Sequence, residues 1–404
     1  MDAEGNEELA KVAEALGVVR CCGTALAALA QYGANTREEL AGMIDDFDAL
    51  PDVYHRLAPE YTARLEHARE LVAENAKVVD AILAFYRRAL RTRPKAVQQQ
   101  RCNCGCFEEE DDEEDDKKKK EQQQQHKEGK RARKETRKVS WEHQQMAQNI
   151  VMQLYREWGV EGAAERAECF APVVAMCRKY APAPAAETGG RARCMVPGAG
   201  LCRLAYEVAA ALPHVDVLAC EVSHAMLLPA QYLLGAHVPA RTHTLYPFAH
   251  VTANVVHAAT MPHAPVHVPD VCVDPQLLRR GRLALTSDDF VSFCHAQPRA
   301  GSFDLLATCF FVDTAYNILD YIQAAARLLR PGAYWVNSGP LHWVHHPRES
   351  VRLTVDEIVA AMETAGFVFV EPPTVLPYRH YCSPPGSLMP MVFDCCLWVA
   401  QLTE

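Results

Sequence analysis

The sequence predicts an α/β fold built on a doubly wound, Rossmann-like sheet, with a helical region before it and a charged insertion between the two. Three observations lead to this prediction. Short apolar runs alternate with stretches of helical periodicity from about residue 190 to the end of the chain, an order typical of parallel sheets covered by helices. A glycine-rich turn joins the first of these runs to the helix after it. Two late apolar runs close the pattern.

The glycine-rich turn lies where nucleotide-binding α/β folds hold their ligand. An apolar run at 194–196 is followed by Gly198 and Gly200, a predicted helix over 204–211, and a second apolar run that ends at Glu221. A carboxylate in that position accepts hydrogen bonds from ribose hydroxyls. The turn therefore predicts a nucleotide-type ligand, with a plain strand-turn-helix connection as the alternative.

The ribose of such a ligand belongs to NAD, FAD or S-adenosylmethionine, and the turn alone does not separate them. The third glycine of the dinucleotide pattern is missing, because Arg203 stands in its place. This difference favours the methyltransferase form of the turn, which has no pyrophosphate to hold.

Composition narrows the class of protein. The chain has 404 residues, of which 49% are hydrophobic, enough for a large core. Its net charge of −10 gives no general attraction to nucleic acid or anionic lipid. No apolar run approaches the ~18 residues of a membrane helix, and the acidic N-terminus lacks a signal-peptide pattern. We therefore expect a soluble protein of the cytoplasm, with the nucleus as a second compartment, whose 16 cysteines are reduced.

Residues 1–92 are predicted to form a helical region, with the helices themselves over 8–92. Thr36 and Glu39 have the spacing of a capping box, which predicts a helix start at that point. The stretch 61–91 carries apolar residues at helical spacing, with charges between them. We expect this region to pack on the sheet domain as a helical layer or to cover its entrance.

Residues 93–140 form a low-complexity insertion before the main domain, which we place at 141–404. Nine consecutive acidic residues over 108–116 are followed by lysine, glutamine and basic runs, a composition typical of disordered segments. The C-x-C-x-C motif at 102–106 lacks the paired C-x₂-C spacing of a zinc site. We therefore predict no metal here.

Two helices are predicted before the first strand, over 143–158 and 162–180. Gln153 and Arg156 lie three residues apart on one face of the first of them. The pattern alone does not separate an exposed polar face from a functional pair.

Two acidic residues follow later strands. Asp289 comes after the apolar run at 283–285, where doubly wound folds bind ligands, and its carboxylate could accept from an adenine amino group. The near-continuous apolar run at 303–311 predicts a central strand buried on both faces. Asp313 stands at its end, either as the N-cap of the next helix or as an acid that faces the substrate.

The C-terminal part contains the remaining strands, predicted over 333–336, 367–371 and 391–400. Before the last two of them, a capping box of Thr354 and Glu357 predicts a helix over 356–365, closed by Gly366. The loop after the first strand holds three histidines, His342, His345 and His346. No carboxylate or cysteine completes a metal site, so we interpret it as a substrate-side loop.

The chain resembles the carnosine N-methyltransferase family over nearly everything outside the charged insertion. The matching segments occur in the family's order, and they include QLYREW at 153–158, ERAECF at 165–170, VPGAGL at 196–201, DDF at 288–290, ATCFFVDTA at 307–315 and PGAYWVNSGPL at 331–341. The resemblance implies a methyltransferase fold with S-adenosylmethionine as cofactor. It also implies methyl transfer to an imidazole nitrogen of the dipeptide carnosine, which gives anserine.

The resemblance further implies which residues form the site. In catalysis, Asp313 would accept the N–H of the substrate imidazole, and His345 would hold the substrate from the far side. The family's loop histidine falls one position away, near Val344. The residues implied to contact the cofactor are Gln153, Arg156, Gly198, Gly200, Glu221, Asp289, Phe290 and Cys309.

The chain departs from the family pattern at two places. Cys202 stands where the family has a glycine, and a small residue is tolerable there if its backbone keeps a negative φ. The family carries tyrosines on its last strand, whereas 391–394 contains no hydroxyl group. This second departure leaves the methyl acceptor open to another histidine-containing dipeptide, peptide or small imidazole compound.

Two further functions compete with these. The basic run after Lys117 is the only feature that favours a nucleic-acid methyltransferase, and a cofactor-binding scaffold without catalysis is the third alternative. We expect a small-molecule substrate, with no nucleic acid, membrane or metal. A homodimer stays open.

Overall fold

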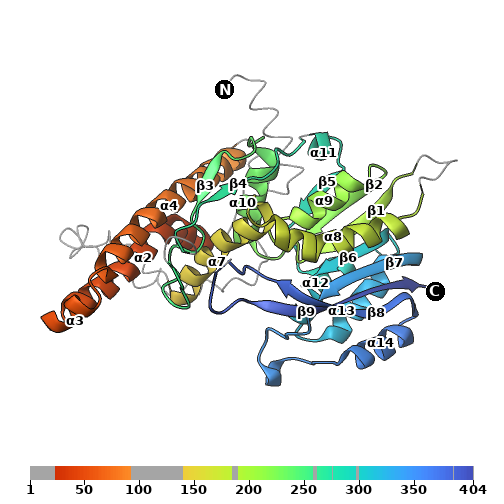
Figure 1. Ribbon diagram of the computed structural model, residues 1–404. Helices are drawn as coiled ribbons and strands as arrows, with labels where there is room; N and C mark the ends of the chain where they lie inside the picture. The colour runs from red at the N-terminus through yellow and green to blue at the C-terminus, as the bar shows by residue number, and fades with distance from the viewer. Residues whose placement is uncertain are drawn as a thin grey trace, which may run out of the picture.

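The computed structural model describes residues 23–91, 140–183, 190–257, 262–274, 276–296, 300–384 and 386–403. Predictions for residues 8–22 and for the insertion before residue 140, including its cysteine motif, lie outside these ranges. The described chain is centred on one seven-stranded sheet with the order β5-β2-β1-β6-β7-β9-β8 (Figure 1). Its strands are β1 (Ala192–Pro197), β2 (Val215–Cys220), β5 (Leu283–Thr286), β6 (Phe303–Cys309), β7 (Leu329–Gly339), β8 (Phe367–His380) and β9 (Val392–Leu402).

The sheet is the predicted doubly wound sheet, extended by a C-terminal hairpin. Strands β5, β2, β1, β6 and β7 run parallel, whereas β9 pairs antiparallel with both β7 and β8. The strand order reverses at β1, which has β2 on one side and β6 on the other. In open α/β sheets this reversal creates the ligand-binding crevice at the carboxyl ends of the strands.

Helices cover both faces of the sheet. The sheet separates the hydrophobic core into two clusters. One cluster lies under the N-terminal helices together with α7 (Trp141–Trp158), α8 (Ala163–Tyr180), α9 (Arg203–Ala211) and α10 (His224–Gly235). The other lies under α12 (Phe290–His295), α13 (Ile318–Leu328) and α14 (Val355–Thr364). The shorter elements are a two-stranded sheet of β3 (His243–Leu245) and β4 (Val266–Val268), the helix α11 (Gln276–Arg279), and the 3₁₀ turns η3 (Val312–Thr314) and η4 (Pro347–Glu349).

The N-terminal helices are α2 (Gly23–Asp48), α3 (Asp52–Leu57) and α4 (Tyr61–Arg91), and the long pair lies against α7 and α10 (Figure 1). The predicted helix start at Thr36 is wrong, because α2 runs through it without a break. Thr36 is fully buried and accepts a hydrogen bond from Gln148 of α7, and Gln144 of α7 donates to Glu39 at 2.7 Å. The two residues therefore join α2 to α7 instead of capping a helix.

Other local predictions are confirmed. The capping box of Thr354 and Glu357 is present at the start of α14, and Gly366 follows that helix with φ +91°. Strand β6 occupies the middle of the sheet and is buried along nearly its whole length. Strands β7 and β8 extend well beyond the short apolar runs at 333–336 and 367–371, since hydrogen bonding to β9 continues past them.

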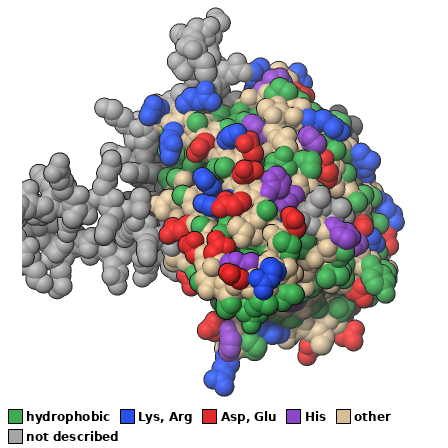
Figure 2. All heavy atoms as spheres, turned by 60° about the vertical axis from the view of Figure 1, so that its left-hand side comes forward, with side chains coloured by type: hydrophobic (Ala, Val, Ile, Leu, Met, Phe, Trp, Pro, Cys, Tyr) green, Lys and Arg blue, Asp and Glu red, His purple; other side chains and the backbone are tan. Residues whose placement is uncertain are grey.

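The surface carries charges of both signs. In Figure 2 the molecule is turned so that the side with the N-terminal helices comes forward. On that face, acidic and basic side chains lie next to one another. Exposed pairs three residues apart on α4, Glu66 with Arg69 and Glu74 with Lys77, contribute to this mixture. None of the helices in the described part of the chain combines the length and apolar character needed to cross a bilayer.

Candidate active site

A cavity of about 660 Å³ lies at the reversal of the strand order. It is bounded by residues that follow the carboxyl ends of β1, β2, β5 and β6, and by helix α7 and the end of β8. The cavity lining brings together all eight residues predicted to contact the cofactor, Gln153, Arg156, Gly198, Gly200, Glu221, Asp289, Phe290 and Cys309. His345 also lines it, whereas Asp313 lies next to the lining residue Thr314 and is not itself part of the lining.

The glycine turn has no room for side chains. Gly198 and Gly200 have φ of +57° and +55°, a region that only glycine adopts at low cost. A Cβ on Gly198 would lie 2.4 Å from the Phe311 ring, and one on Gly200 would lie 2.7 Å from Oε1 of Glu157. Both glycines are therefore required by their backbone conformation and by close neighbours.

Cys202 does not meet the condition of a negative φ. Its φ is +63°, so it has a left-handed backbone as the N-cap of α9. Its side chain is fully buried and burial raises the pKa of the thiol well above its usual range. The backbone at this position thus has the conformation of a glycine turn, although the Cβ of Cys202 makes that conformation strained.

Glu221 is held rigidly at the end of β2. Its Oε2 accepts the backbone N–H of Gly200 at 2.8 Å, and its Oε1 accepts that of Ser223 at 2.8 Å. Burial raises the pKa of the carboxyl, and these two N–H groups oppose the shift. Because each carboxylate oxygen has a second lone pair, the group can still accept ribose hydroxyls from the cavity.

Arg156 supplies a buried positive charge. Its side chain is 5% exposed and lines the cavity, so the interpretation of an exposed polar face is wrong for this residue. Its Nε and Nη2 groups have no hydrogen-bond partner, and the nearest carboxylate, that of Glu165, is 4.0 Å away. The guanidinium lies over the rings of Phe170, Phe310 and Tyr381. Unpaired N–H groups of this kind fit a ligand carboxylate.

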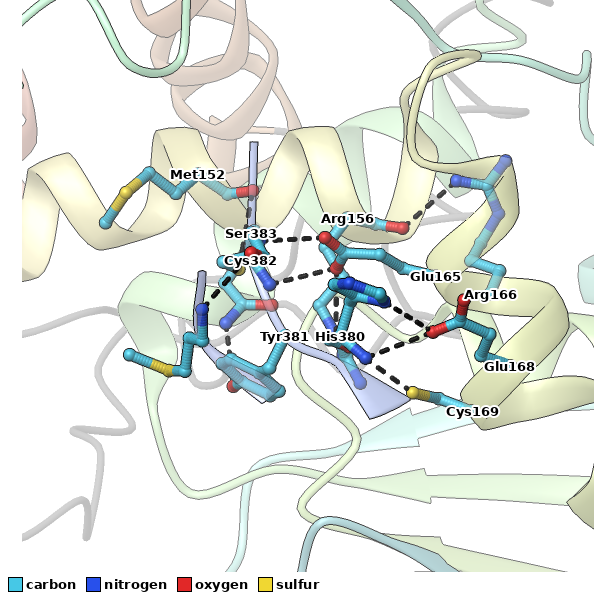
Figure 3. A network of polar contacts seen from close by, with 12 residues as sticks. Met152, Arg156, Glu165, Arg166, Glu168, Cys169, His380, Tyr381, Cys382 and Ser383 are labelled. Atoms are coloured by element: carbon cyan, nitrogen blue, oxygen red, sulfur yellow. Dashed lines mark hydrogen bonds and ion pairs between the residues drawn. The ribbon is translucent and has the colours of Figure 1, made fainter. Parts of the chain in front are cut away.

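The end of β8 is fastened over Arg156 by helix α8 (Figure 3). Glu165 accepts the backbone N–H groups of Cys382 and Ser383 at 2.9 and 2.8 Å, and Glu168 accepts the N–H of His380 at 3.0 Å. These bonds place Tyr381 in the cavity, where its hydroxyl oxygen accepts from Gln153 Nε2 at 2.8 Å. Burial raises the pKa of Tyr381 to about 12, so its hydroxyl keeps a proton to donate.

An aromatic wall bounds the cavity on the side of α12 and α13. Phe311 stacks on Tyr321 with ring centres 4.7 Å apart, and Phe290 meets both rings edge-on at 5.5 Å. Asp289 stands beside this wall as the N-cap of α12, and its Oδ1 accepts the N–H of Ser292 at 2.8 Å. The flat apolar wall and the neighbouring carboxylate together fit a purine ring with an amino group.

Asp313 and the histidine loop lie together at one edge of the cavity. Asp313 is 4% exposed, and its Oδ2 accepts the backbone N–H of His342 at 3.0 Å. Burial raises the pKa of this carboxyl, and the His342 N–H opposes the shift. The N-cap interpretation of Asp313 is wrong, since Asn317 caps α13 and Asp313 lies inside η3.

The three histidines of this loop have separate environments. His345 stacks on Tyr316 with ring centres 3.5 Å apart, and its Nε2 bonds to the Thr314 carbonyl at 2.8 Å. A carbonyl only accepts, so Nε2 carries the proton and Nδ1 of the neutral ring is left as an acceptor. His342 instead packs edge-on against Phe393, and His346 is the N-cap of η4. No metal cluster is present within the residues that the structure describes.

Sequence reasoning missed several residues of the cavity. Glu157 stands next to Arg156 and is buried under the glycine turn, where burial raises its pKa to about 7. Tyr381 brings a hydroxyl from the end of β8, although 391–394 has none. The one available signal was Glu157 itself, an acid next to Arg156 at the end of this helix. Tyr381 and the stacking ring of Tyr316 reach the site only through tertiary contacts.

The fold and the cavity define a class I type α/β transferase with an adenosine site. Glu221 fits the ribose, the aromatic wall fits the base, and the unpaired N–H groups of Arg156 fit an amino-acid carboxylate, which together match S-adenosylmethionine. The family model for carnosine N-methyltransferase matches residues 133–404. The chain therefore belongs to the carnosine N-methyltransferase family, whose methyl donor is S-adenosylmethionine.

Relatives from several organisms are similar to this chain. Rat carnosine N-methyltransferase is 28% identical over 379 residues, which cover 92% of this chain and 83% of the relative. The mouse enzyme is 34% identical over 264 residues, or 63% of this chain and 62% of its own length. The fission yeast enzyme is 27% identical over 282 residues, which cover 66% of this chain and 73% of the relative.

The solved structures that are similar to this chain are much more distant. Phosphoethanolamine N-methyltransferase 2 of Haemonchus contortus, in complex with S-adenosylmethionine, aligns with a TM-score of 0.35 and 12% identity. The alignment covers 59% of this chain and 44% of that one. The assignment of the fold therefore rests on the sheet order, in which a late antiparallel strand is inserted into the doubly wound order.

Proposed function

We propose that this chain methylates an imidazole nitrogen of carnosine and thereby produces anserine. The observation that carries the proposal is that the eight residues implied for the cofactor line one cavity with His345, and that the cavity edge holds the buried acid Asp313. Family membership supplies the acceptor, because the matching family model and the rat relative both carry the name carnosine N-methyltransferase.

Donor binding is assigned to one set of side chains. Arg156 and Gln153 would hold the methionine end, with Tyr381 between them, and Glu221 would accept from the ribose. S-adenosylmethionine, when bound there, supplies a methyl group on a sulfonium. The rigid mounting of these residues supports a fixed direction for the methyl carbon, which is the main source of rate in a displacement of this type.

Acceptor binding is assigned to Asp313 and the ring pair of Tyr316 and His345. Asp313 would accept the N–H of the substrate imidazole, so that the other ring nitrogen presents its lone pair to the methyl group. The same carboxylate would stabilise the positive charge that develops on the ring. Free imidazole has a pKa near 6.5 and is largely neutral at cytosolic pH, so this chemistry needs no strong base.

One observation favours a second candidate for the methyl acceptor. Phe393 occupies the last strand where the family carries a tyrosine, and it packs against Phe310, His342 and Tyr381. An apolar ring at that point removes a hydroxyl that could bind the dipeptide. Another histidine-containing dipeptide, peptide or small imidazole compound is therefore the alternative acceptor.

The test is a mass-resolved assay with S-adenosylmethionine and a panel of carnosine, homocarnosine and free histidine. The proposal expects methylated carnosine as the main product. Donor binding together with methylation of a different panel member would replace carnosine by the alternative acceptor. Absence of donor binding would contradict the cofactor assignment as well.

A further inference from the structure

The five backbone N–H groups from Ala199 to Arg203 all have acceptors inside the protein. Between Ala199 and Arg203, the N–H of Ala199 bonds to the Cys220 carbonyl and that of Cys202 to the Ala199 carbonyl. The N–H of Gly200 bonds to a carboxylate oxygen of Glu221 at 2.8 Å. The remaining two donors of the turn, from Leu201 and Arg203, bond to Glu157.

Glu157 bridges the beginning of α9 with both of its oxygens. Oε1 accepts the N–H of Leu201 at 3.2 Å, and Oε2 accepts the N–H of Arg203, the first residue of the helix, at 3.2 Å. The side chain reaches this point from the last turn of α7, is 4% exposed, and also lines the cavity. A fixed carboxylate thus lies against the positive end of the helix.

Dinucleotide-binding folds use the same position for a different anion. There the N–H groups of the turn and the helix start bind the pyrophosphate, and the second glycine allows the backbone to approach it. In this chain Gly200 makes room for Glu157, because a Cβ would lie 2.7 Å from Oε1. Above about pH 7, where this carboxyl group is ionised, it occupies these two donors and places a negative charge where phosphate oxygens would have to enter.

We propose that Glu157 determines cofactor specificity by acting as a built-in anion that excludes pyrophosphate-containing nucleotides from this cavity. Adenosine compounds without phosphate, including the methyl donor, need none of the N–H groups that Glu157 takes. The inference rests on the proposed function, since it assumes that the cavity holds an adenosine moiety. It adds that the choice between S-adenosylmethionine and a dinucleotide is made by a side chain outside the turn.

The experiment measures dissociation constants for adenosine and ADP-ribose by calorimetry, in the full-length chain and three variants. Glu157→Ala removes the carboxylate and frees two N–H donors. Glu157→Gln keeps the side-chain volume and removes the charge. Asp304→Asn is the matched control, because Asp304 is a similarly buried acid that accepts a backbone N–H, that of Arg193, at the beginning of β6 and away from the cavity. S-adenosylhomocysteine binding reports whether each variant is folded.

We expect the wild-type chain to bind ADP-ribose far more weakly than adenosine. The ratio of the two constants should fall by about tenfold or more in Glu157→Ala, the effect of gaining charge-assisted hydrogen bonds to phosphate. The ratio should fall by a smaller factor in Glu157→Gln and stay within about twofold in Asp304→Asn. If Glu157→Ala does not fold, the ratio of the two dissociation constants in Glu157→Gln tests the inference by itself.

Two outcomes would overturn the inference, and they can be told apart. An unchanged ratio in folded Glu157 variants that still bind S-adenosylhomocysteine would remove the role of Glu157 and leave the proposed function intact. Failure of the wild-type chain to bind adenosine or S-adenosylhomocysteine would remove both, because the cavity would then not be an adenosine site.

Discussion

The guanidinium carbon of Arg156 lies 4.4 Å from the centre of the Tyr381 ring. Arg156 comes from α7 and Tyr381 from the end of β8, and Glu165 of α8 fastens the two segments together. A buried cation with unpaired N–H groups is costly unless a ligand completes its hydrogen bonds. The contact therefore prepares the cavity for an anionic group at this end.

Replacing Arg156 by Met should weaken binding of S-adenosylhomocysteine by about 10- to 100-fold, because a charged hydrogen-bonded contact to the carboxylate is lost. Binding of 5′-methylthioadenosine, which has no carboxylate, should change by less than about threefold. Calorimetric titration with both ligands checks this. Equal losses for the two ligands would indicate general damage to the cavity and contradict the assignment.

Asp313→Asn should bind the methyl donor normally and lose most methyl transfer. The amide can still accept from the His342 N–H, but it cannot stabilise the charge that develops on the imidazole. Single-turnover assays with carnosine, together with donor titration, measure the two effects separately. Unchanged turnover in this variant would exclude the proposed role of Asp313.

The raised pKa of Asp313 also predicts a stability change with pH. Its ordinary value is 3.8, and burial makes the folded state hold the proton more tightly. Stability from this group is therefore present below the unfolded pKa and is lost as pH rises through the higher folded value. Asp313→Asn should remove this decline, so the variant gains stability relative to wild type as the pH rises above the ordinary value of 3.8.

Urea unfolding across that range, followed by tryptophan fluorescence, provides the measurement. Asp80→Asn is the matched control, since Asp80 is exposed on α4. A parallel pH dependence in wild type and Asp313→Asn would show that burial of this carboxyl carries no cost.

His345→Phe should raise the KM for carnosine by about tenfold while leaving donor affinity unchanged. Phenylalanine keeps the stacking on Tyr316 but lacks the free ring nitrogen that would accept from the substrate, a hydrogen bond of about 1 kcal/mol or more. His342→Phe is the control, because His342 packs on Phe393 and does not line the cavity. Steady-state kinetics with carnosine compares the two. A larger KM effect from His342→Phe would reassign the substrate histidine.

Cys202 offers a test of backbone strain in the glycine turn. Cys202→Gly and Cys202→Ala both remove the sulfur, but only glycine adopts φ of +63° without penalty. The Gly variant should therefore be the more stable by about 1 kcal/mol, the reverse of the order expected inside a helix. Thermal or denaturant unfolding of the pair gives the difference. A more stable Ala variant would mean that the turn relaxes to a negative φ.

Most local structure could be predicted from the sequence, because periodicity and capping patterns are properties of neighbouring residues. Helix α4 has the predicted bounds, and the box of Thr354 and Glu357 starts α14. The Thr36 prediction failed for a physical reason. Its hydroxyl and the carboxylate of Glu39 bond to α7, which lies more than a hundred residues further along the chain.

The sequence by itself determined the doubly wound sheet, the glycine turn and the residues at the carboxyl ends of the strands, since parallel strands bring those ends to one edge. The tertiary structure alone decided which polar groups were left with unused hydrogen-bonding capacity. It buried Arg156 with no hydrogen-bond acceptor for its Nε and Nη2 groups, and it set Glu157 against the helix start. Hydrogen-bond satisfaction depends on what packs around a group in space, and spacing along the chain does not record that.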